Sequence, residues 1–165
     1  MIINVAILAL VTTERLVELL LSKANTARLV ERGAREHAPG HYPLIVSVHV
    51  AWLAALWWLA PGRPIVAAWL GVFILIELGR IWVLVSLGAR WTTRIIVLPD
   101  ESLVRRGPYR WINHPNYWVV VGEIAVLPLV FGLGWVALAF TILNAAVLSI
   151  RIREENRALG RVQRG

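Results

Sequence analysis

The feature that most constrains this chain is the length of its apolar runs. Residues 42–60 contain no Asp, Glu, Lys or Arg, and residues 124–150 are free of these charges as well. At about 1.5 Å per residue, a helix over either run crosses most of the roughly 30 Å hydrocarbon core of a bilayer. Hydrophobic residues make up 58% of the chain, which exceeds the roughly 45–50% of soluble domains. The sequence therefore predicts an integral membrane protein.

We expect an all-α fold of about five transmembrane helices in a single domain over residues 1–165. The helices are predicted over residues 2–21, 42–60, 65–87 and 116–130, and from about residue 135 into the tail. Pro128 and the Phe-Gly-Leu-Gly sequence at residues 131–134 interrupt the last apolar run, which indicates a hairpin of the final two helices. Three helices thus occupy residues 1–87, and residues 88–165 supply a polar loop, the hairpin and a C-terminal helix. A polar connection is expected over residues 22–41.

Positive charge gathers in three polar segments of the chain. Residues 22–41, residues 88–115 and the tail from residue 151 hold 14 of the 17 Lys and Arg residues. With five spans these segments lie on one side of the membrane, and the positive-inside rule assigns that side to the cytoplasm. We therefore expect a bacterial cytoplasmic membrane protein with its N-terminus outside and its C-terminus inside. Topology accounts for the net charge of +7, so nucleic-acid binding is not expected.

Several kinds of chemistry are absent from the sequence. The chain has no cysteine, which excludes disulfides and thiolate catalysis. Its four histidines, His37, His41, His49 and His114, lack metal-ligand spacing, so no metal site is expected. The glycine-rich phosphate-binding motifs of soluble nucleotide folds are missing too.

Two polar motifs flank the predicted hairpin. The first comprises Gly-Pro-Tyr-Arg at residues 107–110 and His-Pro-Asn-Tyr at residues 114–117. From composition alone it is equally well explained as an interfacial loop, with aromatic side chains at headgroup depth. In the second motif, at residues 151–155, Arg151 faces Glu154 and Glu155 at helical spacing, and Asn144 lies two turns earlier on the same face. Spacing alone favours a solvated helix end with surface ion pairs.

The two motifs in this order, with an apolar hairpin between them, resemble the isoprenylcysteine carboxyl methyltransferase family. The related phospholipid N-methyltransferases share the pattern, which covers about residues 90–160. The resemblance implies a membrane methyltransferase whose cofactor, S-adenosylmethionine, lies between the His-Pro loop and the C-terminal helix. The residues that we expect to bind this cofactor are Tyr109, His114, Tyr117, Asn144, Arg151, Glu154 and Glu155.

One position departs from the family's pattern. The family usually carries Arg or Lys directly before the His-Pro pair, where this chain has Asn113. We expect Arg110 or Arg106 to hold the carboxylate of the cofactor or of the substrate in its place. Arg110 is therefore counted among the predicted catalytic residues.

The N-terminal half is similar to short bacterial members of the family. The similar segments are residues 14–19, the His-Tyr-Pro sequence at residues 41–43, His49 and residues 90–96. Some of those proteins are linked to O-methylation of long-chain alkylpyrones. The expected reaction is therefore O-methylation of a carboxylate or an acidic hydroxyl on a prenylated or long-chain alkyl substrate within the membrane. His49 by itself is better explained as a packed polar residue than as a catalyst.

Glu77 and Arg80 lie three residues apart inside the third predicted helix. A charge at the centre of a bilayer costs about 2.5–3.5 kcal/mol or more, so such residues are usually paired, inward-facing and functional. We expect both to line the substrate cavity as catalytic residues. The alternative is a structural ion pair that also involves Glu14 or Glu18, and Glu123 either lines the cavity or meets Arg80.

Three other functions remain open from the sequence. Phospholipid N-methylation would require a neutral amine and a site that accepts its proton. An NADPH-dependent membrane reductase has a somewhat similar C-terminal region but requires a site for the 2'-phosphate. A non-catalytic membrane scaffold would leave both motifs merely interfacial. The expected partners are a lipophilic substrate and membrane lipids, and oligomeric state does not follow from the sequence.

Overall fold

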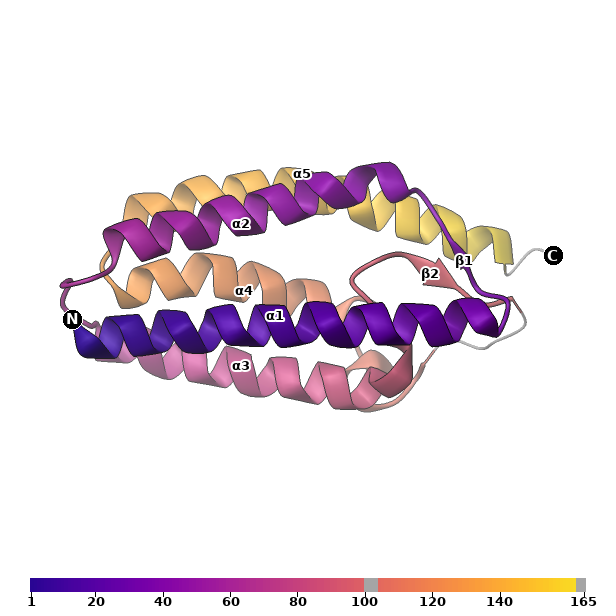
Figure 1. Cartoon of the computed structure of the whole chain (residues 1–165), viewed down its shortest axis with the longest axis horizontal. Coiled ribbons are helices and arrows are strands. Elements are labelled where there is room, and N and C mark those ends of the chain that lie inside the picture. Colours follow the sequence, from indigo (N-terminus) through magenta and orange to yellow (C-terminus); the bar gives the residue numbers. More distant parts are fainter. Residues whose placement is uncertain (100–103, 163–165) are drawn as a thin grey trace.

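Five α-helices run alternately up and down in a bundle (Figure 1). The computed structural model describes residues 1–99 and 104–162. The helices are α1 (Ile2–Glu31), α2 (Tyr42–Leu59), α3 (Ala67–Leu87), α4 (Pro115–Val130) and α5 (Gly134–Val162). A two-residue strand β1 (Arg35–Glu36) pairs antiparallel with β2 (Ile96–Val97). Apart from this short pair, the predicted all-α class and the hairpin of the last two helices are confirmed.

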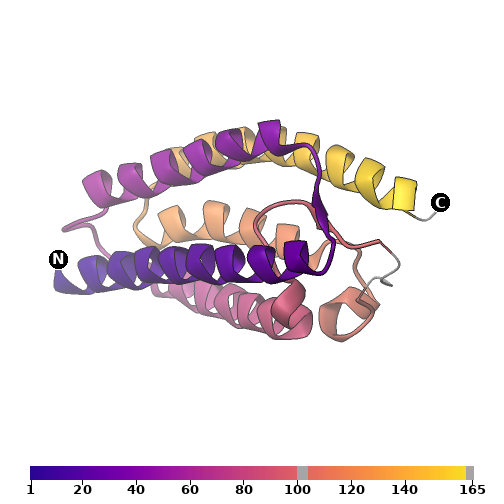
Figure 2. The same ribbon diagram turned by 45° about the vertical axis from the view of Figure 1, so that its right-hand side comes forward.

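Length and composition identify three helical stretches that could cross a membrane, namely Pro39–Leu59, Ala67–Arg90 and Gly134–Ala158. Helix α4 is also apolar but shorter. The 30-residue α1 is the longest helix and carries charged residues at its middle. Figures 1 and 2 show all five helices running side by side, with the C-terminus and the strand pair at one end and the N-terminus at the other.

The predicted end of the first helix at residue 21 is wrong, because α1 continues for ten more residues to Glu31. Polar side chains on this extension find partners in the loop after α3. The Ser22 and Thr93 hydroxyl oxygens are 2.8 Å apart, and the Asn25 amide donates to the Trp91 carbonyl at 2.9 Å. The helix stops where Gly33 adopts a left-handed φ of 91°, a conformation that glycine adopts without penalty.

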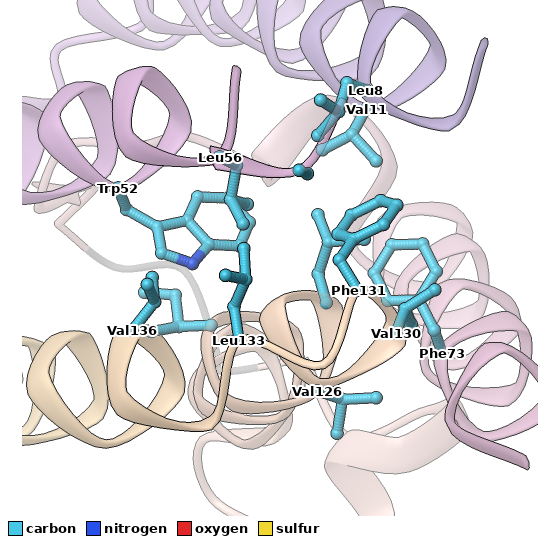
Figure 3. Packing of buried hydrophobic residues seen from close by; sticks show 13 residues of the cluster. Leu8, Val11, Trp52, Leu56, Phe73, Val126, Val130, Phe131, Leu133 and Val136 are labelled. Carbon is cyan, nitrogen blue, oxygen red and sulfur yellow. The ribbon is translucent and has the colours of Figure 1, made fainter. Parts of the chain in front are cut away.

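The packed core lies towards the end that holds the N-terminus, and all five helices contribute to it. Figure 3 shows its largest side chains meeting around the turn between α4 and α5. Phe131, Leu133 and Leu127 in and beside that turn are fully or almost fully buried. Trp52 of α2 packs against them from across the bundle. The opposite end is held together by polar contacts, and this is where the cavities described below lie.

A buried ring of charged side chains joins α1, α3 and α4. Arg80 is only 4% exposed, and its guanidinium donates to both carboxylate oxygens of Glu123 and to those of Glu18 at 3.1 and 3.2 Å. Arg15 closes the ring through Glu18 at 3.0 Å and Glu123 at 3.4 Å. Arg80 thus meets Glu18 and Glu123, two contacts that the sequence left open as alternatives. Within the described residues, Glu77 takes no part in these hydrogen bonds and its Oε1 atom has no partner.

The ring predicts a large effect of removing Arg80. Arg80→Leu leaves Glu123 buried without its main partner, so we expect the free energy of unfolding to fall by about 3–5 kcal/mol. Arg80→Leu with Glu123→Leu should recover most of this loss, since Glu18 keeps Arg15. Thermal unfolding of the purified protein in detergent measures both effects.

Arg157→Ala is the matched control for this experiment. Arg157 forms an exposed ion pair with Glu154 at 2.5 Å, and such pairs contribute about 0–1 kcal/mol. Equal stability of Arg80→Leu and Arg157→Ala would show that the ring does not hold the helices together.

Gly107 allows the polar loop to approach α3 closely. Its φ is +57°, and a Cβ atom built on it would lie 2.0 Å from the Ser86 hydroxyl and 3.2 Å from the Trp82 indole nitrogen. This close contact positions the 3₁₀ turn η3 (Gly107–Arg110), which carries Tyr109 and Arg110.

Two glycine substitutions separate backbone strain from this steric contact. Gly132 also has a positive φ, of +68°, but an added Cβ would meet nothing within 4 Å. Gly132→Ala should cost only the left-handed strain of about 1–2 kcal/mol. Gly107→Ala should cost about 1–3 kcal/mol more, because overpacking adds to the strain. Thermal unfolding compares the two, and equal losses would mean that the approach to α3 is unimportant.

Candidate functional site

Proline and glycine shape the segment between α3 and α4. Pro108 is the second residue of η3 and Pro115 begins α4. Proline suits the first turn of a helix because its missing N–H needs no partner there. The residues between the two turns are therefore held in an irregular loop beside the end of α5. Tyr109, Arg110 and His114 lie on this loop at the wall of a cavity.

The larger cavity has a volume of about 1080 Å³. The loop after α3, the segment from residue 104 to the start of α4, and the last turns of α5 form its walls. Six of the predicted site residues line it, namely Tyr109, Arg110, His114, Tyr117, Arg151 and Glu155. The prediction that the two motifs meet in space is therefore confirmed.

Tyr117 joins the two motifs directly. Its hydroxyl donates to the Glu155 carboxylate and accepts from Arg151 Nε at 2.8 Å. Arg151 also donates to the Thr93 carbonyl at 2.6 Å, which ties α5 to the loop after α3. The Tyr117 ring stacks on His114 with 5.3 Å between centroids. These contacts hold the start of α4, the end of α5 and the loop in one arrangement.

His114 faces the second motif with both ring nitrogens. Its Nε2 lies 3.2 Å from Asn156 Oδ1, and its Nδ1 lies 3.9 Å from Glu155. Because an amide oxygen only accepts, the 3.2 Å contact requires a proton on Nε2. The imidazole is thereby fixed between α5 and the ring of Tyr117.

The larger cavity is strongly basic. Among the described residues on its wall, Glu155 is the one carboxylate, whereas five arginines line it: Arg90, Arg94, Arg105, Arg110 and Arg151. Burial raises the pKa of the nearby Tyr109 phenol above its ordinary value, so this group remains a neutral hydrogen-bond donor. The wall therefore favours an anionic ligand and offers one carboxylate for a cationic group.

Two buried polar atoms on this wall have no hydrogen-bond partner in the part of the chain that the structure describes. They are the amide oxygen Oδ1 of Asn116 and the indole nitrogen Nε1 of Trp91. Buried polar groups nearly always have partners, so each such atom requires an explanation. An acceptor and a donor left open at one cavity suit a polar ligand. The motif prediction included neither as a binding residue, although the aromatic and polar run at residues 90–94 marked the segment.

A smaller cavity of about 240 Å³ adjoins the larger one. It lies between α1, α2, α4 and α5, with Arg80 of α3 on its wall, and most of its surface is apolar, with eight of its twenty lining residues being Leu, Ile or Val. Four residues line both cavities: Trp91, Asn116, Tyr117 and Arg151. A polar, basic chamber and an apolar chamber therefore meet at one shared wall.

The remaining predicted residues lie elsewhere. Arg80 and Asn144 are on the wall of the smaller cavity. Glu154 points to Arg157 on the surface of α5, and Glu77 lies near the charged ring on α3. The structure thus separates these four residues from the six that gather at the larger cavity.

Comparison with known proteins identifies the family of the chain. The model of the isoprenylcysteine carboxyl methyltransferase family matches residues 69–161. Uncharacterized protein YpbQ of Bacillus subtilis is 36% identical over 93% of this chain and 94% of its own length. An uncharacterized protein of Haemophilus influenzae is 25% identical over 88% of each chain. No solved structure matches. The family match covers more than half of the chain and includes every residue of both motifs, and the chain belongs to the isoprenylcysteine carboxyl methyltransferase family.

Proposed function

We propose that this membrane methyltransferase uses S-adenosylmethionine to O-methylate a carboxylate or an acidic hydroxyl on a lipophilic substrate. The observation that carries the proposal is the wall shared by the two cavities. A polar, basic chamber suits the zwitterionic cofactor, and an apolar chamber suits a lipid. Their common wall at Tyr117 and Arg151 is where two such ligands would meet.

The groups on the larger cavity fit the charges of S-adenosylmethionine. Glu155 would bind its ammonium group, and Arg110 or a neighbouring arginine would bind its carboxylate through charge-assisted hydrogen bonds. The open Asn116 oxygen suits an amino or hydroxyl donor of the same ligand. The stacked rings of His114 and Tyr117 offer an aromatic surface to its flat or cationic parts. Arg110 would thus supply the positive charge that the family usually carries at the position of Asn113.

The bound cofactor supplies a methyl group on a positively charged sulfur. In the transfer a bond forms between the substrate oxygen and the methyl carbon, the carbon–sulfur bond breaks, and its electron pair stays on the sulfur of S-adenosylhomocysteine. A carboxylate or an ionised hydroxyl is already nucleophilic, so this chain needs no strong general base. Its contribution is alignment of the two reactants, which can lower a barrier by about 7–11 kcal/mol. The arginines would keep the substrate oxygen ionised.

The smaller cavity supports access from the bilayer. Leu16 and Leu19 of α1 and Val50 of α2 line it, yet between 44% and 62% of each residue is exposed on the outer surface of the bundle. The cavity rim between α1 and α2 therefore consists of apolar side chains that face lipid. A lipophilic substrate could enter there without passing through water.

The proposed orientation follows the charge distribution. The larger cavity, the strand pair and the C-terminal helix lie at the basic end of the bundle. We propose that this end faces the bacterial cytoplasm, where the cofactor is made, and that the N-terminus lies outside.

The first test is cofactor binding, measured by calorimetry of the purified protein with S-adenosylhomocysteine. Glu155→Gln removes the one carboxylate that the described residues contribute to the cavity wall. It should weaken binding by about tenfold to a hundredfold, since a hydrogen bond to a charged group contributes about 1.5–3 kcal/mol. Glu154→Gln is the matched control, because Glu154 points to Arg157 instead, and its affinity should stay close to wild type. Equal losses of affinity in the two variants would contradict the proposed role of Glu155 in binding the cofactor.

NADPH provides the competing outcome, because an arginine-rich wall would also suit phosphate. Binding of NADPH without S-adenosylhomocysteine would favour a reductase, and binding of neither would favour a scaffold. The substrate class is tested by incubating membranes with methyl-labelled cofactor and analysing lipids by mass spectrometry. The proposal expects label in an ester or ether of a lipophilic acid or hydroxyl compound. Label in phospholipid amines would favour N-methylation.

A further inference from the structure

The smaller cavity, whose surface is mostly apolar, carries an unpaired hydrogen-bond donor. Asn144 of α5 lines the cavity and is only 4% exposed, and its amide nitrogen Nδ2 has no partner among the described residues. Burial of an amide donor without a partner costs about 1–3 kcal/mol. An asparagine kept unpaired at this place calls for an acceptor that comes from outside the chain.

An acceptor faces the same cavity from α2. The Nδ1 atom of His49 lies 2.8 Å from the Ile45 carbonyl oxygen, and a carbonyl only accepts, so the proton is on Nδ1. The neutral ring then carries a lone pair on Nε2, which has no hydrogen-bond partner within residues 1–99 and 104–162. His49 lines the cavity and thus adds an acceptor to the donor of Asn144.

Helix geometry puts the two side chains at the same depth. Tyr42 and Arg151 are both bound to Thr93, by contacts of 3.2 and 2.6 Å. From these anchors α2 leads away from the larger cavity along the chain and α5 leads away from it against the chain direction, since the two helices are antiparallel (Figure 1). His49 lies seven residues after Tyr42, and Asn144 lies seven residues before Arg151. At about 1.5 Å per residue, each lies about 10 Å along its helix from the residue that contacts Thr93.

We infer that His49 and Asn144 form a second polar subsite, which recognises a hydroxyl or similar oxygen group on the body of the substrate. The subsite lies away from the wall shared with the larger cavity, so the group that it binds is separate from the oxygen that accepts the methyl. The substrate class is therefore a lipophilic molecule with at least two oxygen functions rather than an acid with a plain hydrocarbon chain. This inference rests on the proposed function and names the substrate of that site.

A neighbouring charged side chain strengthens the inference. Arg15 lines the same cavity, and its Nε atom is buried without a hydrogen-bond partner in the described part of the chain. Its other nitrogens are engaged with Glu18 and Glu123. Together with Asn144, the cavity thus presents two open donors and one open acceptor, which a hydrocarbon chain would leave unsatisfied.

Fatty acids with one added hydroxyl test the subsite. Dodecanoic acid supplies the carboxylate, and the hydroxydodecanoic acids carry the hydroxyl at successive carbons along the same chain. Calorimetry in one detergent measures each dissociation constant for wild type, Asn144→Leu and His49→Phe. Over one stretch of carbon positions in the fatty acid, the hydroxyl should lower the dissociation constant of the wild type. This gain in affinity should exceed the gain in either variant by roughly threefold to tenfold.

Leu148→Met is the matched control, because Leu148 lines the same cavity one turn from Asn144 and has no polar group. This variant should keep the wild-type preference for the hydroxyl. Since Asn144 Nδ2 has no partner to lose among the described residues, Asn144→Leu should fold. His49→Phe tests the subsite independently.

The outcomes separate the subsite from the methyltransferase itself. If all three variants and the wild type bind S-adenosylhomocysteine equally, but no hydroxyl position is preferred by the wild type, the subsite is overturned and the proposed function stands. If Asn144 Nδ2 and His49 Nε2 bind only water, the wild type should likewise show no preference for a hydroxyl, and the subsite is overturned. Absence of S-adenosylhomocysteine binding in the wild type would instead overturn the proposed function.

Discussion

The buried ring around Arg80 is the interaction on which the rest of the structure depends. Apolar helices gain little from burying apolar surface against one another in lipid, since lipid tails are equally apolar. A buried ion pair has no water nearby to replace either partner. Such pairs therefore specify which helices meet and how the helices are aligned along their axes. Arg80 of α3 donates hydrogen bonds to Glu18 of α1 and Glu123 of α4, so both helices are held against α3. The cavities are the spaces that remain once this register is set.

At the polar end, Tyr117 and Thr93 perform the corresponding task. Tyr117 binds Arg151 and Glu155, and Thr93 binds Arg151, Ser22 and Tyr42. Segments from the beginning, middle and end of the chain thus converge on these two residues. This explains why a site can form at an end of the bundle that has little apolar core.

Much of the fold follows from local signals in the sequence. The apolar runs and their Pro and Gly interruptions predict α2, α3, α4 and α5 to within a few residues, because span length and helix breaks are properties of a short segment. The meeting of the two motifs follows from the hairpin alone. The extension of α1 does not, because Ser22 and Asn25 are polar residues whose partners lie more than sixty positions away.

The finer assignment of site residues also requires tertiary information. Helical spacing brings Glu154 and Glu155 equally close to Arg151, and only the position of Tyr117 determines that Glu155 faces the cavity. Asn144 lies on the same helical face as Arg151, as the spacing indicates, but two turns of α5 carry it from the polar chamber to the apolar one. The outline of the smaller cavity has no signal in the sequence, because the Leu, Ile and Val side chains that supply much of its apolar surface are interchangeable.

The wall common to the two cavities has a thermodynamic consequence. A ligand in either chamber that shifts the Tyr117 ring or the Arg151 guanidinium changes the free energy with which the other chamber binds its own ligand. Such coupling is reciprocal, so the two affinities must change by the same factor. The Arg151 side chain joins α5 to α4 and to the loop after α3, so it moves only if these hydrogen bonds rearrange. This wall is therefore suited to carry cooperativity between a water-soluble and a membrane-dissolved reactant.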